Sequence, residues 1–538
     1  MNRTIRTFPL ALGLLLAFAR IALAADEAPE QAAFDVLEYR VLGNTVLPPK
    51  AVEAAVYPHL GPGKHMDDVQ RARAALEDAY RGAGYGTVFV DIPEQSVDEG
   101  IVRLKVTEGK LRQVRVEGAR YFSNRWIRAE LPSAVQGTVP QLPALQEQIA
   151  AANLLTSDMS LVPVLGPGKI PGTVDLTLKV KDELPFHGSL EVNDQYTADT
   201  TPLRLLAAVS YDNLFQRLDS LSLQYQTAPS ERKQVDVLAL GYTARLNDEG
   251  SRLALYYVDS NSDVAAVGTL NVLGKGKVYG ARFTVPMENT VEASHTLSFG
   301  VDYKDFLENI NLDPTKLTDP TQAKLQTPIS YSVLSFGNSS AWRGERQQWT
   351  LSTTGNLGIR GLGNSDEEFA NKRFKGRPNF FYLRGDATSR TRLFSDASLL
   401  VSLSGQYAVD PVISNEQFAL GGASGPRGYL EAEELGDLGV KASLELDSPT
   451  WRWLADRGRL QGFMFVDYGR VSTINPLEGE DSNVYLASYG LGFNVGFTSW
   501  ISGSLTWASP LVNGTRTLNG FRTREGDSRL LFVVRSAW

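Results

Sequence analysis

Apolar and polar residues alternate along many short segments between Phe186 and the end of the chain. In the segment that begins near Val291, Leu297, Phe299 and Val301 share one parity, and the residues between them are polar or glycine. A period of two places the two sets on opposite faces of a strand. An apolar face opposite a polar or small face is typical of a membrane barrel, with lipid outside and water inside. A soluble β-sandwich also alternates, but a run of this length would then require a second core.

Sixteen segments of this kind can be counted, and we predict an all-β transmembrane barrel of sixteen antiparallel strands over residues 186–538. The strands are expected to begin near Phe186, Pro202, Leu218, Lys233, Ser251, Lys277, Val291, Pro328, Glu345, Gly376, Asp396, Gly436, Arg459, Asn483, Trp500 and Ser528. Short and long connections alternate, as expected for periplasmic turns opposite outer loops. An even number of strands leaves both barrel ends on the periplasmic side.

The lumen of such a barrel is wider than its own side chains can fill. The long connection from Val409 to Leu435, residues 409–435, is the candidate to fold into that space. It contains a glycine-rich run from Gly421 to Gly428, where the backbone can turn tightly. We therefore expect a channel that is mostly closed at rest.

Residues 34–109 and 110–185 are predicted to be two copies of one small α+β unit with the order β-α-α-β-β. The first copy opens with a predicted strand from Phe34 to Val46. Its segment Val41-Leu42-Gly43-Asn44 corresponds to Val116-Glu117-Gly118-Ala119 in the second copy. The exposed sheet edge of such a unit can accept an extended peptide as an additional strand. A spacer that only holds the barrel is an equal alternative.

Two features within these copies carry further expectations. The sequence Gly-Pro-Gly-Lys occurs in both, from Gly61 and from Gly166, and we predict turns there. In the first copy, four apolar residues recur at helical spacing and predict a buried helix face. These are Met66, Val69, Leu76 and Tyr80.

The first residues have the pattern of a signal peptide. Arg3 and Arg6 form a positive region, an apolar run extends from Phe8 to Ala19, and Ala22-Leu23-Ala24 is a small-x-small cleavage site. We expect residues 1–24 to be removed and residues 25–33 to form a short N-terminal segment. The mature protein is then outside the cytoplasm.

The composition narrows the classes of function. The chain has 538 residues, no cysteine and a formal net charge of -8. The absence of cysteine excludes disulfides and cysteine-based metal sites. The mild acidity, without a long run of one sign, argues against nucleic acid as a partner. No uninterrupted apolar run reaches the ~18 residues of a transmembrane helix.

No motif for chemistry is present. The histidines His59, His65, His187 and His295 are not in a metal-binding spacing. The frame of a nucleophile elbow fails at Pro426, and the longer frame of a phosphate loop is absent. We expect neither an enzyme nor a bound cofactor or metal.

Three motifs carry a family resemblance. The long loop contains Pro426-Arg427-Gly428-Tyr429, and the predicted strand that begins near Arg459 contains Phe465-Val466-Asp467-Tyr468-Gly469. The first periplasmic turn contains Tyr211-Asp212-Asn213-Leu214-Phe215. With the two repeats, these resemble the two-partner secretion transporters, the haemolysin and filamentous-adhesin secretion or TpsB family of the Omp85 superfamily. Pro426 stands where valine is more usual.

The resemblance implies two POTRA domains in the periplasm and a barrel in the outer membrane whose sixth outer loop lies in the lumen. It implies export of one large unfolded exoprotein, recognised at its N-terminal secretion domain by the POTRA domains, without a nucleotide. Outer-membrane lipid and the barrel-assembly machinery are the other expected partners. Some members have an N-terminal plug helix. Here the first repeat begins near Phe34, so we expect no such plug.

The resemblance and the parity of the strands together predict an ion pair between Arg427 and Asp467 in the lumen. Asp467 shares its parity with Phe465 and lies opposite the lipid-facing residues of its strand. Lys441 and Glu445 are expected to be further lumen charges. Two unrelated solvated charges are the alternative, and exposed ion pairs contribute only about 0–1 kcal/mol.

The last predicted strand places Phe532 and Val534 on one face and ends at Trp538, which resembles the assembly signal of outer-membrane proteins. Ser536 departs from the usual apolar residue. Two other functions remain. An insertase of the Omp85 superfamily would carry more repeats, and a diffusion porin would carry none.

Overall fold

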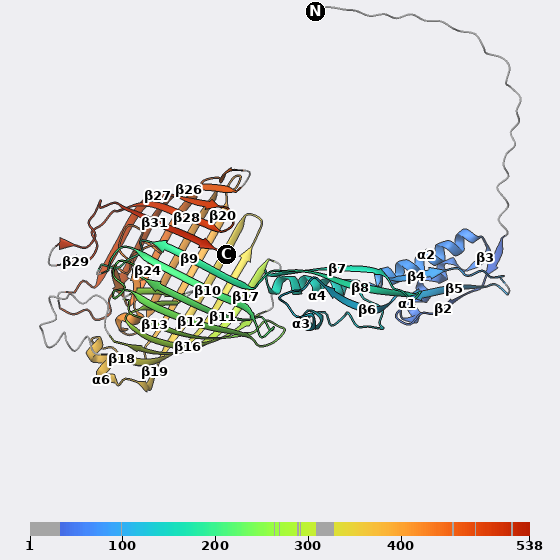
Figure 1. Cartoon of the computed structure of the whole chain (residues 1–538), viewed down its shortest axis with the longest axis horizontal. Coiled ribbons are helices and arrows are strands. Elements are labelled where there is room, and N and C mark those ends of the chain that lie inside the picture. The colour runs from blue at the N-terminus through green and yellow to red at the C-terminus, as the bar shows by residue number, and fades with distance from the viewer. Residues whose placement is uncertain are drawn as a thin grey trace, which may run out of the picture. The chain divides into compact units, whose positions relative to one another are not determined.

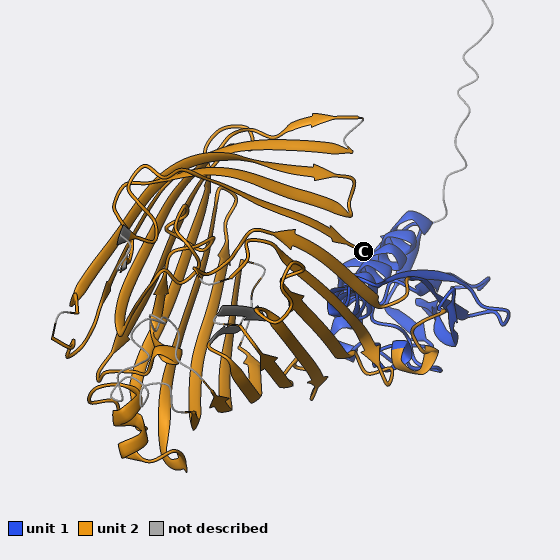
Figure 2. Cartoon of the chain, turned by 60° about the vertical axis from the view of Figure 1, so that its left-hand side comes forward, with its two compact units in different colours: residues 1–119, 127–182 blue, residues 120–126, 183–538 orange. Residues whose placement is uncertain are grey.

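The structure is a computed structural model. It describes residues 33–97, 99–198, 200–262, 264–267, 270–287, 290, 292–307, 328–454, 457–478, 480–517 and 520–538. The predicted signal peptide, residues 1–24, and the short segment 25–33 up to residue 32 lie outside the described residues. The chain forms two compact units, one of residues 1–119 with 127–182 and one of residues 120–126 with 183–538 (Figure 2).

The first repeat has a three-stranded sheet packed against two helices. Its elements are β1 (Phe34–Val36), β2 (Glu38–Leu42), α1 (Pro49–Val56), η1 (Tyr57–His59), β3 (Gly61–Lys64), α2 (Met66–Gly82), β4 (Val88–Asp91) and β5 (Ile101–Glu108). The sheet order is β2-β5-β4, and β2 runs parallel to β5. Val69, Leu76 and Tyr80 of α2 are buried, as the helical spacing predicts, whereas Met66 is exposed because it begins the helix.

Two predictions for this repeat were wrong. The opening strand is split into β1 and β2 rather than continuous from Phe34 to Val46, because β1 pairs with β3 and β2 pairs with β5. Gly61–Lys64 is not a turn but the strand β3, whose Gly63 N–H donates to Asp35. In the second repeat, Gly166 and Pro167 likewise end a strand, and the turn follows them.

The second repeat has the same arrangement. It consists of β6 (Lys110–Glu117), α3 (Asn124–Ala129), α4 (Leu142–Leu155), β7 (Met159–Pro167) and β8 (Thr173–Asp182). The sheet order is β6-β8-β7. The two repeats meet at Gly84, whose carbonyl accepts from Leu142 N–H at 2.9 Å. Gly84 has φ +91, and a Cβ there would lie 2.9 Å from Pro143, so only glycine fits this joint.

The second unit is a closed antiparallel barrel (Figure 1). Its sixteen strands are β9 (Phe186–Asn193), β10 (Arg204–Leu214), β11 (Asp219–Thr227), β12 (Asp236–Arg245), β13 (Arg252–Ser260), β16 (Gly276–Pro286), β17 (Ala293–Phe306), β18 (Ile329–Arg343), β19 (Gln347–Gly363), β20 (Phe381–Arg392), β21 (Ser398–Ala408), β24 (Leu438–Asp447), β26 (Gly458–Ser472), β27 (Asn483–Phe497), β28 (Ile501–Pro510) and β31 (Arg529–Ala537). The predicted count is confirmed. The barrel closes where β31 pairs with β9 over Val533–Ala537.

Short elements lie in the connections. They are β14 (Val264–Val267), β15 (Leu270–Leu273), α6 (Asp366–Lys372), η4 (Ser414–Glu416), β22 (Phe418–Leu420), β23 (Glu434–Gly436), β25 (Trp451–Trp453), β29 (Arg516–Thr517) and β30 (Gly520–Phe521). The strand predicted near Gly376 begins five residues later, at Phe381, because α6 and the turn after it occupy the segment. Across the described part of the chain, no helix is both long and apolar enough to cross a membrane.

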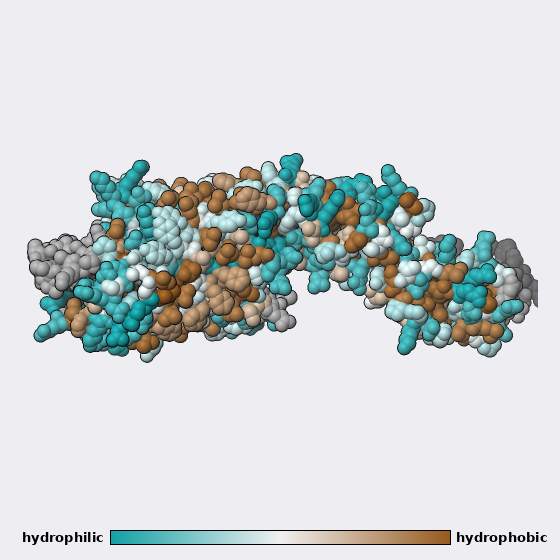
Figure 3. All heavy atoms as spheres, turned by 90° about the horizontal axis from the view of Figure 1, so that it is seen from below, coloured by the Kyte–Doolittle hydropathy of each residue, from teal (hydrophilic) through white to brown (hydrophobic). Residues whose placement is uncertain are grey.

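The barrel wall has the predicted two faces. Leu297, Phe299 and Val301 of β17 point outward, with Phe299 and Val301 among the exposed residues, and Asp302 points inward and is buried. Apolar side chains gather on the outside of the barrel, with hydrophilic ones toward its ends (Figure 3). This outer band matches the hydrocarbon layer, where apolar side chains face lipid.

Candidate functional site in the barrel lumen

The loop 409–435 packs against the inner face of the barrel. Val412, Ile413, Leu420 and Tyr429 are all nearly completely buried, although they lie in a connection between strands. Their partners are inward-facing residues of the wall, described below. The loop therefore fills part of the lumen.

Arg427 is the centre of a charge cluster at the tip of this loop. Its Nε and Nη2 donate to the two carboxylate oxygens of Asp467 at 2.8 and 2.9 Å, and its Nη1 donates to Glu445 at 2.6 Å. Its backbone N–H also donates to Asp467, at 3.0 Å. The guanidinium lies 3.4 Å from the ring centroid of Phe465 and contacts Ser443 at 3.1 Å. The predicted Arg427–Asp467 pair is present, in a two-pronged geometry that only arginine can make.

The burial of this cluster makes each partner costly to remove. The side chain of Asp467 is 1% exposed, and those of Arg427 and Glu445 are 15% and 14% exposed. A carboxylate in such surroundings is stable in its charged form only with a cation and further hydrogen bonds. Ser443 supplies one of these, because its hydroxyl donates to Asp467 at 2.6 Å.

The strand motif Phe465-Val466-Asp467-Tyr468-Gly469 can now be explained residue by residue. Phe465 stacks under Arg427, and Asp467 binds it. Gly469 leaves room for Leu420 of the loop, since a Cβ at position 469 would lie 2.1 Å from that side chain. Alternate residues of the motif thus face the lumen, as a strand requires.

The loop motif follows the same principle. Pro426 is buried after a cis peptide bond, and Gly428 has φ +95, where an added Cβ would lie 3.3 Å from the Cβ of Ala508 on β28. The hydroxyl of Tyr429 lies 2.9 Å from the carbonyl oxygen of Ala487 and 2.7 Å from that of Val512. The loop tip is therefore held against β24, β26, β27 and β28.

The remaining predicted lumen charge also contacts the loop. Lys441 Nζ donates to the hydroxyl of Ser424 at 2.9 Å and lies 5.7 Å from the ring centroid of Phe418. Lys441 is thus a lumen residue, as the parity of its strand predicts, and it holds the loop on the same side as Arg427.

A second anchor, which the sequence analysis missed, holds the beginning of the loop. Glu416 is 2% exposed and accepts from Lys304 Nζ at 2.6 Å and from the hydroxyls of Tyr331 and Tyr382 at 2.5 and 2.6 Å. These partners lie on β17, β18 and β20, on a different side of the barrel from the Arg427 cluster. The inward parity of Lys304, opposite lipid-facing Tyr303, was the available signal.

A third buried carboxylate closes the loop at its end. Asp437 is completely buried and accepts from Arg373 at 3.1 Å and from the backbone N–H groups of Val412 and Ile474 at 3.0 and 2.7 Å. It therefore joins both ends of the loop to the segment that carries α6.

The outer half of the lumen contains an apolar cluster, which we call the outer seal. It is built from inward-facing strand residues, from α6 and from the beginning of the loop. Its main members are Val235, Val237, Val258, Phe306, Tyr331, Phe369, Phe380, Tyr382, Val412 and Ile413. The sequence signal for α6 was available, because Ser365 and Glu368 form a capping box at its N-terminus.

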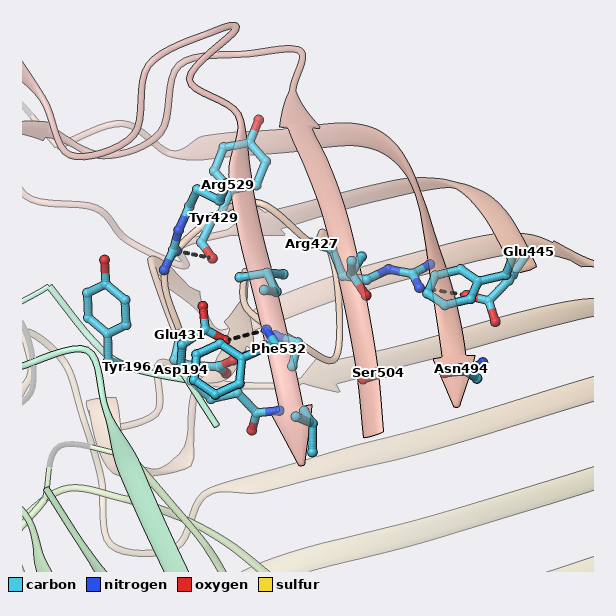
Figure 4. A pocket seen from close by; sticks show the side chains of 16 residues that line it. Asp194, Tyr196, Arg427, Tyr429, Glu431, Glu445, Asn494, Ser504, Arg529 and Phe532 are labelled. Carbon is cyan, nitrogen blue, oxygen red and sulfur yellow. Dashed lines mark hydrogen bonds and ion pairs between the residues drawn. The ribbon is translucent and has the colours of Figure 1, made fainter. Parts of the chain in front are cut away.

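A small cavity of about 270 Å³ remains between the loop tip and the closing strands (Figure 4). Arg427, Tyr429 and Glu431 line it from the loop, and Arg529 lines it from β31. Arg529 donates to the carbonyl of Tyr429 at 3.0 Å. This contact ties the loop to the last strand of the barrel.

The motif from Tyr211 to Phe215 lies mostly on β10 rather than in the turn predicted for it, and a neighbouring segment is bound beside it. Asn213 and Gln216 both donate to the carbonyl oxygen of Tyr121, at 3.3 and 2.9 Å, and Gln216 accepts from Ser123 N–H at 2.7 Å. Residues 120–126 belong to the same compact unit as the barrel. Asn213 of the motif and the nearby Gln216 therefore hold Tyr121 and Ser123 within that unit.

The end of the chain lies against the first barrel strand. The backbone N–H and carbonyl groups of Trp538 exchange hydrogen bonds of 3.0 Å with Gly188. A Cβ at Gly188 would lie 2.5 Å from the Trp538 ring, so the ring packs in the space that a side chain at position 188 would occupy. Val534 faces outward, and Phe532 N–H donates to Asp194 at 2.9 Å.

Comparisons with known proteins point to one family. The family model described as haemolysin secretion/activation protein ShlB/FhaC/HecB matches residues 172–495, and that of the ShlB-type POTRA domain matches residues 34–109. The outer membrane transporter CdiB of Dickeya dadantii (strain 3937) is 22% identical over 93% of this chain and 87% of its own length. The heme/hemopexin transporter protein HuxB of Haemophilus influenzae (strain 86-028NP) is 22% identical over 85% and 79%.

Two solved structures share the fold. CdiB from Escherichia coli is 19% identical and superposes with a TM-score of 0.59, covering 97% of this chain and 93% of its own. BamA from Haemophilus ducreyi, lacking POTRA domains 1–3, is 16% identical with a TM-score of 0.56, covering 94% and 100%.

Proposed function

The chain belongs to the haemolysin secretion/activation protein family ShlB/FhaC/HecB, whose members are outer-membrane transporters, and from that premise we propose how it exports its exoprotein. The barrel lies in the outer membrane, and the N-terminal POTRA domain lies in the periplasm. The observation that carries the proposal is the lumenal loop. It is fastened at Arg427 and at Glu416 by side-chain bonds, which can be released without breaking the barrel.

We assign to the contact between Arg427 and Asp467 the role of holding the loop in its transport-competent position. While the contact holds, the loop tip covers the wall of β24–β28. Support for this assignment is that Arg427, from the loop motif, is bound through both carboxylate oxygens of Asp467, from the strand motif.

We propose that the second repeat is a second POTRA domain and that it recognises the exoprotein. Its strand β7 pairs only with β8, so one edge is open within the repeat. Val162 and Val164 are exposed on that strand. An extended segment of the exoprotein can add to this edge through backbone hydrogen bonds and cover the two valines. The other edge strand, β6, is partly occupied, because Leu111 already bonds to Gly137 and Thr138.

This edge also has a built-in limit. Pro163 and Pro167 lie on β7 and remove two donors from it. Proline on an edge strand discourages indiscriminate strand pairing. Replacing Val164 by proline, next to Pro163, would remove a further donor and should weaken binding of the secretion domain. Val162→Asp should act on the apolar part of the contact and leave the ladder intact. Unchanged binding for both variants would exclude this edge.

Lipid contacts the outer apolar band, and the barrel-assembly machinery inserts the protein. No nucleotide is needed, and the exported chain moves forward as it folds outside. An insertase is the alternative from the same superfamily, since the fold is shared with BamA. The match of the secretion family model to residues 172–495 favours secretion.

The test is a comparison of the secreted and surface proteins of cells with and without the gene. Secretion predicts that one large protein disappears from the surface and medium and returns with the wild-type gene. An insertase predicts instead that many outer-membrane barrels decline together. That second outcome would refute the proposal.

A further inference from the structure

A second, much larger cavity lies along one side of the lumen. Its volume is about 1340 Å³, and it is lined mostly by inward-facing residues of β9–β13 and β16, with residues of β31 at one side. Trp500 and Trp538, at the periplasmic strand ends, line it at one end. Ala239 and Val258 line it at the other end and also belong to the buried cluster of the outer seal. The cavity is therefore a vestibule that begins at the periplasmic side and ends beneath the seal.

The anchors of the loop are placed away from this wall. Glu416 is bound by residues of β17, β18 and β20, and Arg427 is bound by residues of β24 and β26. Tyr429 is held at β27 and just beyond β28. The bonds that fasten the loop thus leave the wall of β10–β13 available as a path.

The chemistry of the vestibule wall is unlike that of a small-molecule site. Small or uncharged side chains occupy successive inward positions on four neighbouring strands and on β16. They include Ala208, Ser222, Ala239, Gly241, Ala254 and Thr284. Small-molecule sites are typically about 300–1,000 Å³, apolar or aromatic, with a few convergent polar groups. This vestibule is larger, and its polar groups are spread along its length.

The strongest charge on this wall is already neutralised. Arg282 donates to both carboxylate oxygens of Asp302 at 2.9 and 2.8 Å, and the hydroxyl of Tyr256 also bonds to Asp302. A neutralised pair neither attracts nor repels a passing charged side chain strongly. Arg535 and His187 are the other lining residues that can carry charge, and the rest of the lining is small, apolar or uncharged. Such a wall suits a ligand whose side chains vary from position to position.

We propose that this vestibule is the site that holds an extended segment of the exported polypeptide before it crosses the outer seal. This inference rests on the proposed function and deepens it by placing the exported chain on the wall of β10–β13. The segment is an unfolded polypeptide, bound along its backbone rather than by a particular side chain. It enters while the loop is still anchored, and the outer seal is the last barrier on its path.

The absence of native cysteine allows a direct test by site-specific crosslinking in the full chain. Ser222→Cys and Ala254→Cys place single thiols on the vestibule wall. Ser402→Cys, on the inner face of β21, and Leu221→Cys, on the lipid face of β11, are the matched controls. The probe is the exoprotein identified by the gene-deletion comparison, carrying one cysteine and a C-terminal disulfide-closed domain that stalls it during export.

Proximity in the lumen raises the effective thiol concentration to about the mM range, so adducts at Ser222→Cys and Ala254→Cys should exceed both controls by about tenfold or more. Ala254→Trp, which narrows the vestibule, should reduce export, whereas Ser402→Trp should not. Adducts at Ser402→Cys but not on the vestibule wall, with normal surface display, would overturn the path while leaving the function intact. If no exoprotein disappears when the gene is deleted, the proposed function itself is refuted.

Discussion

Replacing Arg427 by alanine should release the loop tip while the barrel still assembles. The substitution removes the cation that lies between Asp467 and Glu445, which are 1% and 14% exposed. Removing one partner of a buried pair costs about 3–5 kcal/mol. At about 1.4 kcal/mol for each tenfold change, this shifts the equilibrium between the bound and the released loop tip by roughly two to three and a half orders of magnitude. Export should fall because the loop no longer returns to its transport-competent position.

The structure also ranks the partners. Asp467 accepts from the Arg427 backbone N–H as well as from its side chain, and the backbone bond survives in Arg427→Ala. Asp467→Ala loses both bonds, but leaves Arg427 paired with Glu445. The two effects should therefore be strongly non-additive, with a coupling energy of about 1–3 kcal/mol in a double-mutant cycle. Arg427→Lys should restore little, because lysine lacks the two-pronged grip.

Labelling of a buried thiol measures this release directly. Ser488 is completely buried beside Ala487, whose carbonyl oxygen lies within hydrogen-bonding distance of Tyr429, and Ser488→Cys is nearly isosteric. Its reaction with a maleimide should be slow in the otherwise wild-type chain and fast with Arg427→Ala. Heat resistance in detergent serves as the control for barrel assembly. Strict additivity of the Arg427→Ala and Asp467→Ala effects on labelling and export would refute the coupling.

Three further perturbations test other parts of the structure. Phe369→Ala, in the buried face of α6, should open the outer seal and raise antibiotic uptake, because such truncations cost about 3–5 kcal/mol of packing. Phe374→Ala, at an exposed position, should not raise uptake, and equal uptake by both variants would exclude α6 from the seal. Glu416→Gln should remove the charge partner of Lys304 and accelerate hydrogen exchange at residues 414–417 while Ser488→Cys stays protected, and simultaneous exposure of both would mean a single anchor. In the first repeat, the His65 N–H and then Arg71 hold the pKa of Asp68 below its usual range. The capping contribution of Asp68 to α2 should thus be complete above the ordinary pKa of 3.8 and be lost as the pH falls through the lowered pKa. Hydrogen exchange in the first turn of α2 that does not change with pH in this way, or that Asp68→Asn leaves unaltered, would contradict this.

The strand pattern was sufficient to predict the barrel because a period of two assigns each residue to lipid or lumen. Asp467 and Glu445 could be placed inside on parity alone, and both face the lumen in the structure. Parity could not say which strands the loop would touch. Glu416 shows this limit, since its partners Lys304, Tyr331 and Tyr382 come from three strands that are distant in sequence.

The short elements were harder to predict for a different reason. Gly61–Lys64 has the composition of a turn, yet tertiary pairing with β1 makes it a strand. α6 has a readable capping box at Ser365, but it is only seven residues long and lies in a connection expected to be irregular. Local sequence sets such elements only weakly, and packing decides them.

The central claim is that this single chain moves an unfolded exoprotein across the outer membrane without a nucleotide. Liposomes that contain only this protein, loaded on the POTRA side with the unfolded exoprotein, test it most directly. Protease added on the opposite side should reach exoprotein that has been exported and has folded there in the wild-type liposomes. It should reach little or none with Arg427→Ala. Failure of the wild-type protein to export, or insertion of unrelated outer-membrane barrels into the same liposomes instead, would contradict the claim.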